Sequence, residues 1–263
     1  MYNPYEFSTH KIISIKQETK IDYTFRVEFH KEVIGGQFLE ISLPGVGEAP
    51  ISICNFSDTW IEMTIRKVGK LTEQIFKLKS GDYLYLRGPY GNGFDTDVLK
   101  EKDLVFITGG TGLAPVRKTI DFFMKNPSYC KSIELISGFK SPKDCLFLED
   151  IDSWSKKAPV FVTVDTPDES WNGYKGLVTE HIDKLELSKV SEKTAVVVGP
   201  PIMMKFATLE LIKRGFLESN IWVSFERKMS CGIGKCGHCK IDETYVCLEG
   251  PVFNYVKAKK LID

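Results

Sequence analysis

The chain has 263 residues, and 43% of them are hydrophobic, which is enough for one large packed domain or two ordinary ones. The formal net charge is zero, so neither a nucleic acid nor an anionic membrane is expected as a partner. No apolar run approaches the roughly 18 residues of a membrane helix. The start, MYNPYEFSTHK, lacks the pattern of a signal peptide, and we therefore expect a cytoplasmic protein.

Residues 1–98 have the pattern of antiparallel β-strands. Apolar residues alternate with polar ones from Tyr23 to Phe29, and again in WIEMTIRK and DYLYLR. This period of two is typical of half-buried strands, and turn sequences such as IGG, LPGVG and KSGD separate the runs. The pattern predicts a small antiparallel β-barrel or sandwich.

Residues 99–223 alternate between strand and helix patterns. DLVFITGG, SIELISG, APVFVTVD and TAVVVGP are apolar runs typical of buried strands, and WVSF is expected to be the last strand. LAPVRKTIDFFMKNP has helical spacing, with Val116, Ile120, Phe123 and Met124 on one face. Met204, Ala207 and Leu211 share the face of a later helix. Strand–helix alternation predicts a parallel α/β domain.

Two turns at strand ends have the composition of a phosphate site. In ITGGTGLAP and VVVGPPIMMK, glycine lies between an apolar strand and a helix, where free N–H groups face an anion. Pro115 is expected at a first helical position, and it replaces the third glycine of the dinucleotide fingerprint. Each turn alone could be an ordinary tight loop, but two neighbouring turns could flank one crevice.

Residues 224–263 contain four of the seven cysteines, spaced C-x4-C-x2-C-x7-C. The first three match the loop of a plant-type [2Fe–2S] site, whose bridging sulfides need N–H donors and glycine. A zinc site and structural thiols remain alternatives. His238 is expected to be a solvated loop residue, while Cys54, Cys130 and Cys145 are expected to be small buried side chains.

Taken in order, PIS, GKLT, GPYGNGF, GGTGLAP, VVGPPIMM and CGIGKC resemble the ferredoxin–NADP reductase superfamily over essentially the whole chain. The chain resembles more narrowly the electron-transfer subunits that carry a C-terminal [2Fe–2S] cluster. Its ending, CLEGPVFNYVKAKKLID, looks most like that of the electron-transfer subunits of anaerobic sulfite reductases. Electron-transfer subunits of dihydroorotate dehydrogenase and gamma subunits of soluble hydrogenases are similar as well.

The resemblance implies an FAD-binding barrel over 1–98, an NAD(P)-binding α/β domain over 99–223 and a cluster-binding segment over 224–263. It also implies cofactor contacts at matching positions. These are Pro50, Ile51, Ser52, Thr64, Ile65, Arg66, Gly69, Lys70, Leu71 and Thr72 for FAD; Gly109, Gly110, Thr111, Gly112, Leu113, Pro115, Gly199, Pro200 and Met203 for the nicotinamide nucleotide; and Cys231, Cys236, Cys239 and Cys247 for the cluster. Ala49 stands where the family usually has an arginine, and Arg66 or Lys70 could supply that charge.

The implied function is electron transfer from NADH through FAD and the cluster to a partner, with no catalytic acid or base. By resemblance, the partners would be iron–sulfur and sirohaem subunits of a sulfite reductase complex. Dihydroorotate dehydrogenase or hydrogenase partners are the alternatives, and a zinc-binding scaffold is the alternative from another class. Asp165 favours NADH, whereas Lys140 leaves NADPH open.

Overall fold

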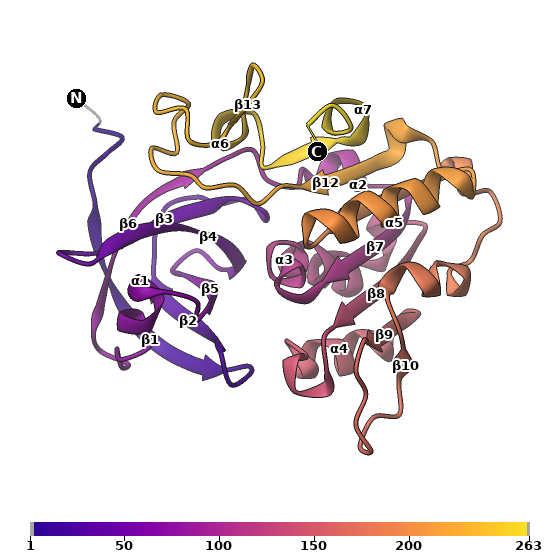
Figure 1. Cartoon of the computed structure of the whole chain (residues 1–263), viewed down its shortest axis with the longest axis horizontal. Coiled ribbons are helices and arrows are strands. Elements are labelled where there is room, and N and C mark those ends of the chain that lie inside the picture. The colour runs from indigo at the N-terminus through magenta and orange to yellow at the C-terminus, as the bar shows by residue number, and fades with distance from the viewer. Residues whose placement is uncertain (1–2, 262–263) are drawn as a thin grey trace. The chain divides into compact units, whose positions relative to one another are not determined.

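The computed structural model describes residues 3–261, which divide into two units (Figure 1). One unit comprises the residues up to Phe94 together with Glu226–Pro251, and the other comprises Asp95–Phe225 together with the segment from Val252. The chain therefore enters each unit twice. The domain limits at residues 98 and 223 stay predictions.

The first unit contains the predicted antiparallel barrel, closed in the order β1-β2-β5-β4-β3-β6. Alternate residues of its strands fill the core, among them Phe25 and Val27, Ile61 and Met63, and Leu86. Closure pairs β1 with β6 and leaves no free sheet edge. Its elements are β1 (Ser8–Gln17), β2 (Asp22–Glu28), β3 (Phe38–Leu43), β4 (Gly47–Phe56), β5 (Trp60–Arg66), α1 (Lys70–Ile75) and β6 (Tyr83–Tyr90).

The second unit is the predicted α/β domain, with the sheet order β10-β9-β8-β7-β11-β12-β15. All neighbouring strands are parallel except β15, which pairs antiparallel with β12. The expectation that β12 is the last strand is therefore wrong, because a later segment adds a strand beside it. The strands are β7 (Asp103–Gly109), β8 (Ser132–Phe139), β9 (Val160–Val164), β10 (Tyr174–Lys175), β11 (Lys193–Val198), β12 (Ile221–Ser224) and β15 (Val252–Asn254).

Helices α3 and α5 provide the buried faces that the sequence predicts. Val116, Ile120 and Phe123 of α3 are buried, as are Met204 and Leu211 of α5. Helix α3 contacts α4, whereas α5 contacts the 3-10 segment η4, so that two helical layers cover the sheet (Figure 1). The helices are α2 (Thr96–Leu99), α3 (Leu113–Lys125), α4 (Leu148–Ser155), α5 (Pro201–Lys213) and α7 (Tyr255–Ala258), with the 3-10 segments η1 (Gly110–Gly112), η2 (Pro127–Tyr129), η3 (Pro142–Asp144), η4 (Val178–Lys184), η5 (Val190–Glu192) and η6 (Glu218–Asn220).

The cysteine-rich segment belongs to the barrel unit. It contains a short hairpin of β13 (Lys240–Ile241) and β14 (Thr244–Tyr245), followed by α6 (Val246–Glu249). Asn92, just after β6, donates hydrogen bonds from its backbone to Gly250 O and from its side chain to Glu249 O. Within residues 3–261, no helix is long and apolar enough to cross a bilayer.

Candidate functional site

The four cysteines of the C-terminal segment lie together as two pairs of sulfur atoms. The side chains of Cys231 and Cys236 are hydrogen-bonded to each other, and so are those of Cys239 and Cys247. Two thiolates for each iron is the donor set that a [2Fe–2S] cluster requires. Within residues 3–261, no three His, Cys, Asp or Glu side chains are arranged to hold a single metal ion. The structure thus brings the four predicted ligands together as two pairs of thiols, and their role as cluster ligands stays a prediction.

Backbone N–H groups of the loop point at these sulfurs. Cys231 Sγ accepts from the N–H groups of Ile233, Lys235 and Cys236 at 3.3–3.5 Å. Gly234 N–H donates to Cys247 Sγ at 3.2 Å. Such donors stabilise thiolates and raise the reduction potential of a bound cluster.

The ionisation of the thiols differs within the loop. The His238 N–H lowers the pKa of the exposed Cys236 thiol, whereas burial and the hydrogen bond with Cys239 raise the pKa of Cys247 to about 12. His238 thus acts here through its backbone. Its side chain is exposed, as the sequence predicts.

The start of the cluster loop is fastened to strand β6 by two side chains. Arg87 donates to the carbonyl oxygens of Ser230 and, at 2.7 Å, of Cys231. Gly232 has a positive φ of 73°, and a Cβ there would lie 2.6 Å from the ring of Tyr90. Only glycine lets the loop lie this close to the tyrosine ring.

The two predicted nucleotide turns pack against each other at the carboxyl ends of β7 and β11. Cβ atoms built on Gly109 and Gly199 would both contact Met203 Cε, at 3.0 and 2.5 Å. A Cβ at Gly112 would lie 2.4 Å from Val198 O. The structure therefore brings these predicted residues into one place, and the glycines allow the close approach.

This place is the topological switch point of the sheet. From β7 the chain proceeds outward to β8 and β9, and then returns to the other side of β7 as β11 and β12. Open α/β sheets bind ligands in the crevice at such a point. Helix α3 begins at Leu113, so Pro115 is its third residue and not the first, as expected from the sequence. Its missing N–H still costs nothing, because the first four N–H groups of a helix lack partners.

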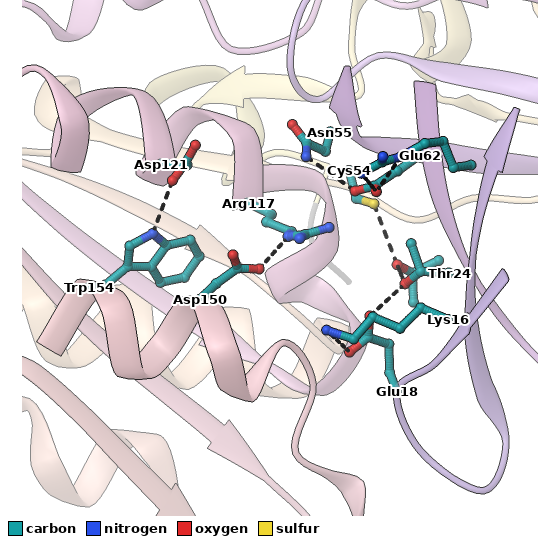
Figure 2. A network of polar contacts seen from close by, with 12 residues as sticks. Lys16, Glu18, Thr24, Cys54, Asn55, Glu62, Arg117, Asp121, Asp150 and Trp154 are labelled. Atoms are coloured by element: carbon teal, nitrogen blue, oxygen red, sulfur yellow. Dashed lines mark hydrogen bonds and ion pairs between the residues drawn. The ribbon is translucent and has the colours of Figure 1, made fainter. Parts of the chain in front are cut away.

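The predicted flavin residues lie on neighbouring strands of the barrel, with different exposure. Pro50, Ile51 and Ser52 on β4 are half-buried, but Ile65 belongs to the barrel core and could contact a ligand only through its backbone. The Thr64 hydroxyl is 2.8 Å from the Thr24 hydroxyl and 3.4 Å from Cys54 Sγ. Thr24 and Cys54 are labelled in the polar network of Figure 2.

The turn after β5 contains the remaining flavin candidates. The Thr72 hydroxyl accepts hydrogen bonds from the N–H groups of Val68 and Gly69 and so fixes the turn, while Leu71 packs against the barrel core. Arg66 forms a two-point ion pair with the buried Asp22, at 2.8 and 3.1 Å.

Lys70, in contrast, is exposed, and it forms no ion pair within residues 3–261. Of the two candidates for the positive charge missing at Ala49, Lys70 is therefore better placed to receive a phosphate.

Arg87 and Glu40, which face each other in the register of β6 and β3, are not among the residues predicted from the sequence. Glu40 lies in the apolar run FLEISL, and a charged residue between Leu39 and Ile41 is a signal in the sequence. Of the remaining cysteines, Cys54 and Cys145 are buried as expected, but Cys130 is only half-buried.

Comparison with known proteins supports both cofactor units. Residues 106–208 match the family described as the oxidoreductase NAD-binding domain, and residues 226–259 match the iron–sulfur cluster binding domain of dihydroorotate dehydrogenase B. Sulfhydrogenase 1 subunit gamma of Pyrococcus furiosus is 36% identical, over 96% of this chain and 92% of its own length. The chain belongs to the ferredoxin–NADP reductase-like family.

Other similar proteins point to the same family and the same fold. A probable electron-transfer subunit of dihydroorotate dehydrogenase B from the same organism is 35% identical, over 91% of this chain and 85% of its own length. The fold matches an NADH-dependent reduced ferredoxin-NADP oxidoreductase with a TM-score of 0.77 and 24% identity, covering 98% of this chain and 94% of that one. It also matches a ferredoxin reductase of carbazole 1,9a-dioxygenase, with a TM-score of 0.71 and 25% identity over 82% and 68% of the two chains.

Membership in this family confirms the predicted class, an oxidoreductase subunit of the NAD(P)H-dependent flavin and iron–sulfur type. It also confirms the predicted cofactors, which are FAD, an iron–sulfur cluster and NADH. The zinc-scaffold alternative receives no support, because the cysteine segment matches an iron–sulfur domain.

Proposed function

We propose that this chain takes electron pairs from NADH and delivers them singly to a catalytic partner subunit. The observation that carries the proposal is the combination, in one chain, of two packed nucleotide turns and a loop with two pairs of thiols. FAD, when bound, supplies the conversion between the two-electron chemistry of a nicotinamide and the one-electron chemistry of a cluster. The chain itself supplies binding and orientation.

We assign the flavin to the barrel residues of the sequence prediction. Pro50 and Ser52 would contact it from β4, and the Thr72-braced turn would place backbone N–H groups and Lys70 near its phosphates. Arg66 would act by holding β5 to Asp22, because its guanidinium is already paired.

We assign the nicotinamide nucleotide to the glycine turns that open α3 and α5. Gly109, Gly110 and Gly112 would let its pyrophosphate approach the first turn of α3, where N–H groups point outward. Met203 and Pro200 would form the opposite wall. Cys231, Cys236, Cys239 and Cys247 would hold the cluster.

NADH is the expected donor because of the charge at the end of β9. Asp165 follows this strand, and the neighbouring Thr166 N–H donates to Lys140 O at 2.9 Å. Burial raises the pKa of Asp165, and the negative charge of Glu180 raises it further. The positive charge of Lys140 lowers it. A 2′-phosphate would therefore meet two carboxylates and one ammonium group, and this charge balance disfavours NADPH.

The partner that we propose is the catalytic subunit of a hydrogenase or a dihydroorotate dehydrogenase. Relatives over nearly the full chain are named as subunits of these two systems. The C-terminal ending CLEGPVFNYVKAKKLID favours a second candidate, the iron–sulfur and sirohaem subunits of an anaerobic sulfite reductase. A cytoplasmic location stays a prediction.

Anaerobic purification from the native host, with the proteins that accompany the chain, tests the proposal. Analysis should find FAD, iron and acid-labile sulfide, and NADH should bleach the visible absorbance of flavin and cluster. The complex is then assayed for NADH-linked hydrogen, orotate and sulfite turnover, and the active reaction identifies the partner. A preparation that contains all cofactors but is not bleached by NADH would refute the proposal.

A further inference from the structure

A buried carboxyl group lies on the outer face of the barrel, on the same face as Arg87. Leu39 and Ile41 point into the barrel core, so Glu40 between them points outward. Its side chain is nevertheless fully buried. Neither carboxylate oxygen has a hydrogen-bond partner within residues 3–261. A buried carboxyl group without a hydrogen bond lowers the free energy of unfolding, so its presence needs a functional explanation.

Arg87 connects this carboxyl group to the cluster loop. It is opposite Glu40 in the β3–β6 register, and it is 3% exposed. Its guanidinium donates to Cys231 O at 2.7 Å, to Tyr90 Oη at 3.2 Å and to Glu48 Oε1 at 2.8 Å. Arg87 thus contacts Glu48 and the backbone of the first cluster ligand, and it lies opposite Glu40 on the neighbouring strand.

Charged groups on three neighbouring segments act on Glu40. These are Arg87 on β6, Glu48 on β4 and Cys231 on the cluster loop. Burial raises the pKa of Glu40 to about 7. The charge of Arg87 lowers this pKa, whereas the charges of Glu48 and Cys231 raise it. Glu40 and the cluster loop therefore lie within electrostatic reach of each other.

We propose that Glu40 and Arg87 form a charge pair that sets the reduction potential of the iron–sulfur cluster. Reduction adds one electron, and hence one negative charge, at the cluster. The Glu40 carboxylate disfavours that charge and Arg87 favours it, and solvent screens neither strongly because both side chains are buried. Arg87 is in addition a positioning residue, since it holds the Ser230 and Cys231 carbonyls.

The test is a redox titration of the anaerobically purified holoprotein, monitored through the electron paramagnetic resonance signal of the reduced cluster. The titration is done at pH 8.5, above the raised pKa of Glu40. For Glu40→Gln we expect the equilibrium constant of cluster reduction to rise at least tenfold, which is 59 mV upward for a one-electron couple. Glu48→Gln is the matched control. It also removes a carboxylate that bonds to Arg87, but its side chain is about one-third exposed (32%), so the change should stay below threefold.

Arg87→Lys keeps the charge but loses the fork of hydrogen bonds. We expect it to retain less iron and to keep the reduction equilibrium within threefold of the parent. A tenfold shift in this variant would assign the potential to hydrogen bonding and overturn the charge-pair proposal. So would a Glu40→Gln variant within threefold of the parent, or an equal effect of Glu48→Gln.

The spectrum and iron content of Glu40→Gln should match the parent, which separates a charge effect from a damaged site. If that variant loses its cluster, Glu40→Met tests the same loss of charge with an apolar side chain of similar length. The inference rests on the proposed function, but different results would refute the inference and the function. A parent protein without iron and labile sulfide refutes the function, whereas an iron-loaded parent with an unshifted Glu40→Gln variant refutes only the charge pair.

Discussion

Gly112→Ala probes the contact between the two nucleotide turns. Gly112 has φ −62° and ψ −14°, which alanine adopts freely, so the substitution introduces no backbone strain. Its Cβ would however lie 2.4 Å from Val198 O and 2.7 Å from Gly199 Cα. Ordinary contact begins at 3.4 Å, so the turns must separate by 1.0 Å (3.4 minus 2.4). Both neighbours are backbone atoms and cannot rotate away.

A forced separation of this kind costs about 1–3 kcal/mol of folding stability. Each kcal/mol lowers the Tm of a domain of this size by about 2–4 °C. Because misplacement by about 1 Å can reduce catalytic efficiency by a factor of about 100, we expect the KM for NADH to rise ten- to hundredfold. The assays are thermal unfolding and steady-state reduction of an artificial electron acceptor by NADH.

Gly45→Ala is the control for these measurements. Gly45 has a positive φ of 76° and open space around its Cβ, so alanine there costs about 1 kcal/mol through the backbone alone. It should lower the Tm without changing the KM for NADH. If Gly112→Ala kept the parent KM and Tm, the two turns would not form one nucleotide site in the way that we infer.

Three further outcomes are expected. Cys231→Ser should lose most of the bound iron, whereas Cys130→Ser, a half-exposed thiol outside the loop, should keep it; equal iron contents would contradict the ligand assignment. Asp165→Asn should raise kcat/KM for NADPH at least tenfold relative to NADH, and an unchanged ratio would place the 2′-hydroxyl elsewhere. In the cofactor-free protein, the pKa of Glu40 is raised from 4.5 to about 7, so ionisation is less favourable in the folded state than in the unfolded state. The free energy of unfolding therefore falls as the pH rises through this range. Glu40→Gln should therefore be more stable than the parent at pH 8, by on the order of 3 kcal/mol, and should lose this advantage near pH 4 in urea unfolding; the opposite order would refute the sign.

The sequence predicts the elements of this fold well because each has a local signature. Alternation in residues 22–28 and 60–66 follows directly from one face lining the barrel core. The glycine turns and the four cysteines are equally local, since their spacing along the chain reflects backbone geometry. The family assignment and the cofactors follow from these motifs together.

Pairing over long sequence distances has no such signature. Strand β15 is three residues long, and only its pairing with β12 makes it part of the sheet. Likewise, the bonds of Arg87 to Ser230 and Cys231 join residues more than 140 positions apart. The sequence shows Glu40 as a charge within an apolar run, but its position opposite Arg87 follows only from the pairing of β3 with β6.

The placement of the cluster loop explains how so irregular a segment can be ordered. Ser224 at the end of β12 and Val252 at the start of β15 are paired in the sheet, so the ends of residues 225–251 are held together. The loop-closure entropy is thus offset by strand pairing before any cofactor binds. Arg87, Tyr90 and Asn92 then fix the loop to β6 and the turn after it. A loop closed at its ends and fastened near its start can present four thiols without a core of its own, and loss of β15 pairing should release iron even though every ligand is retained.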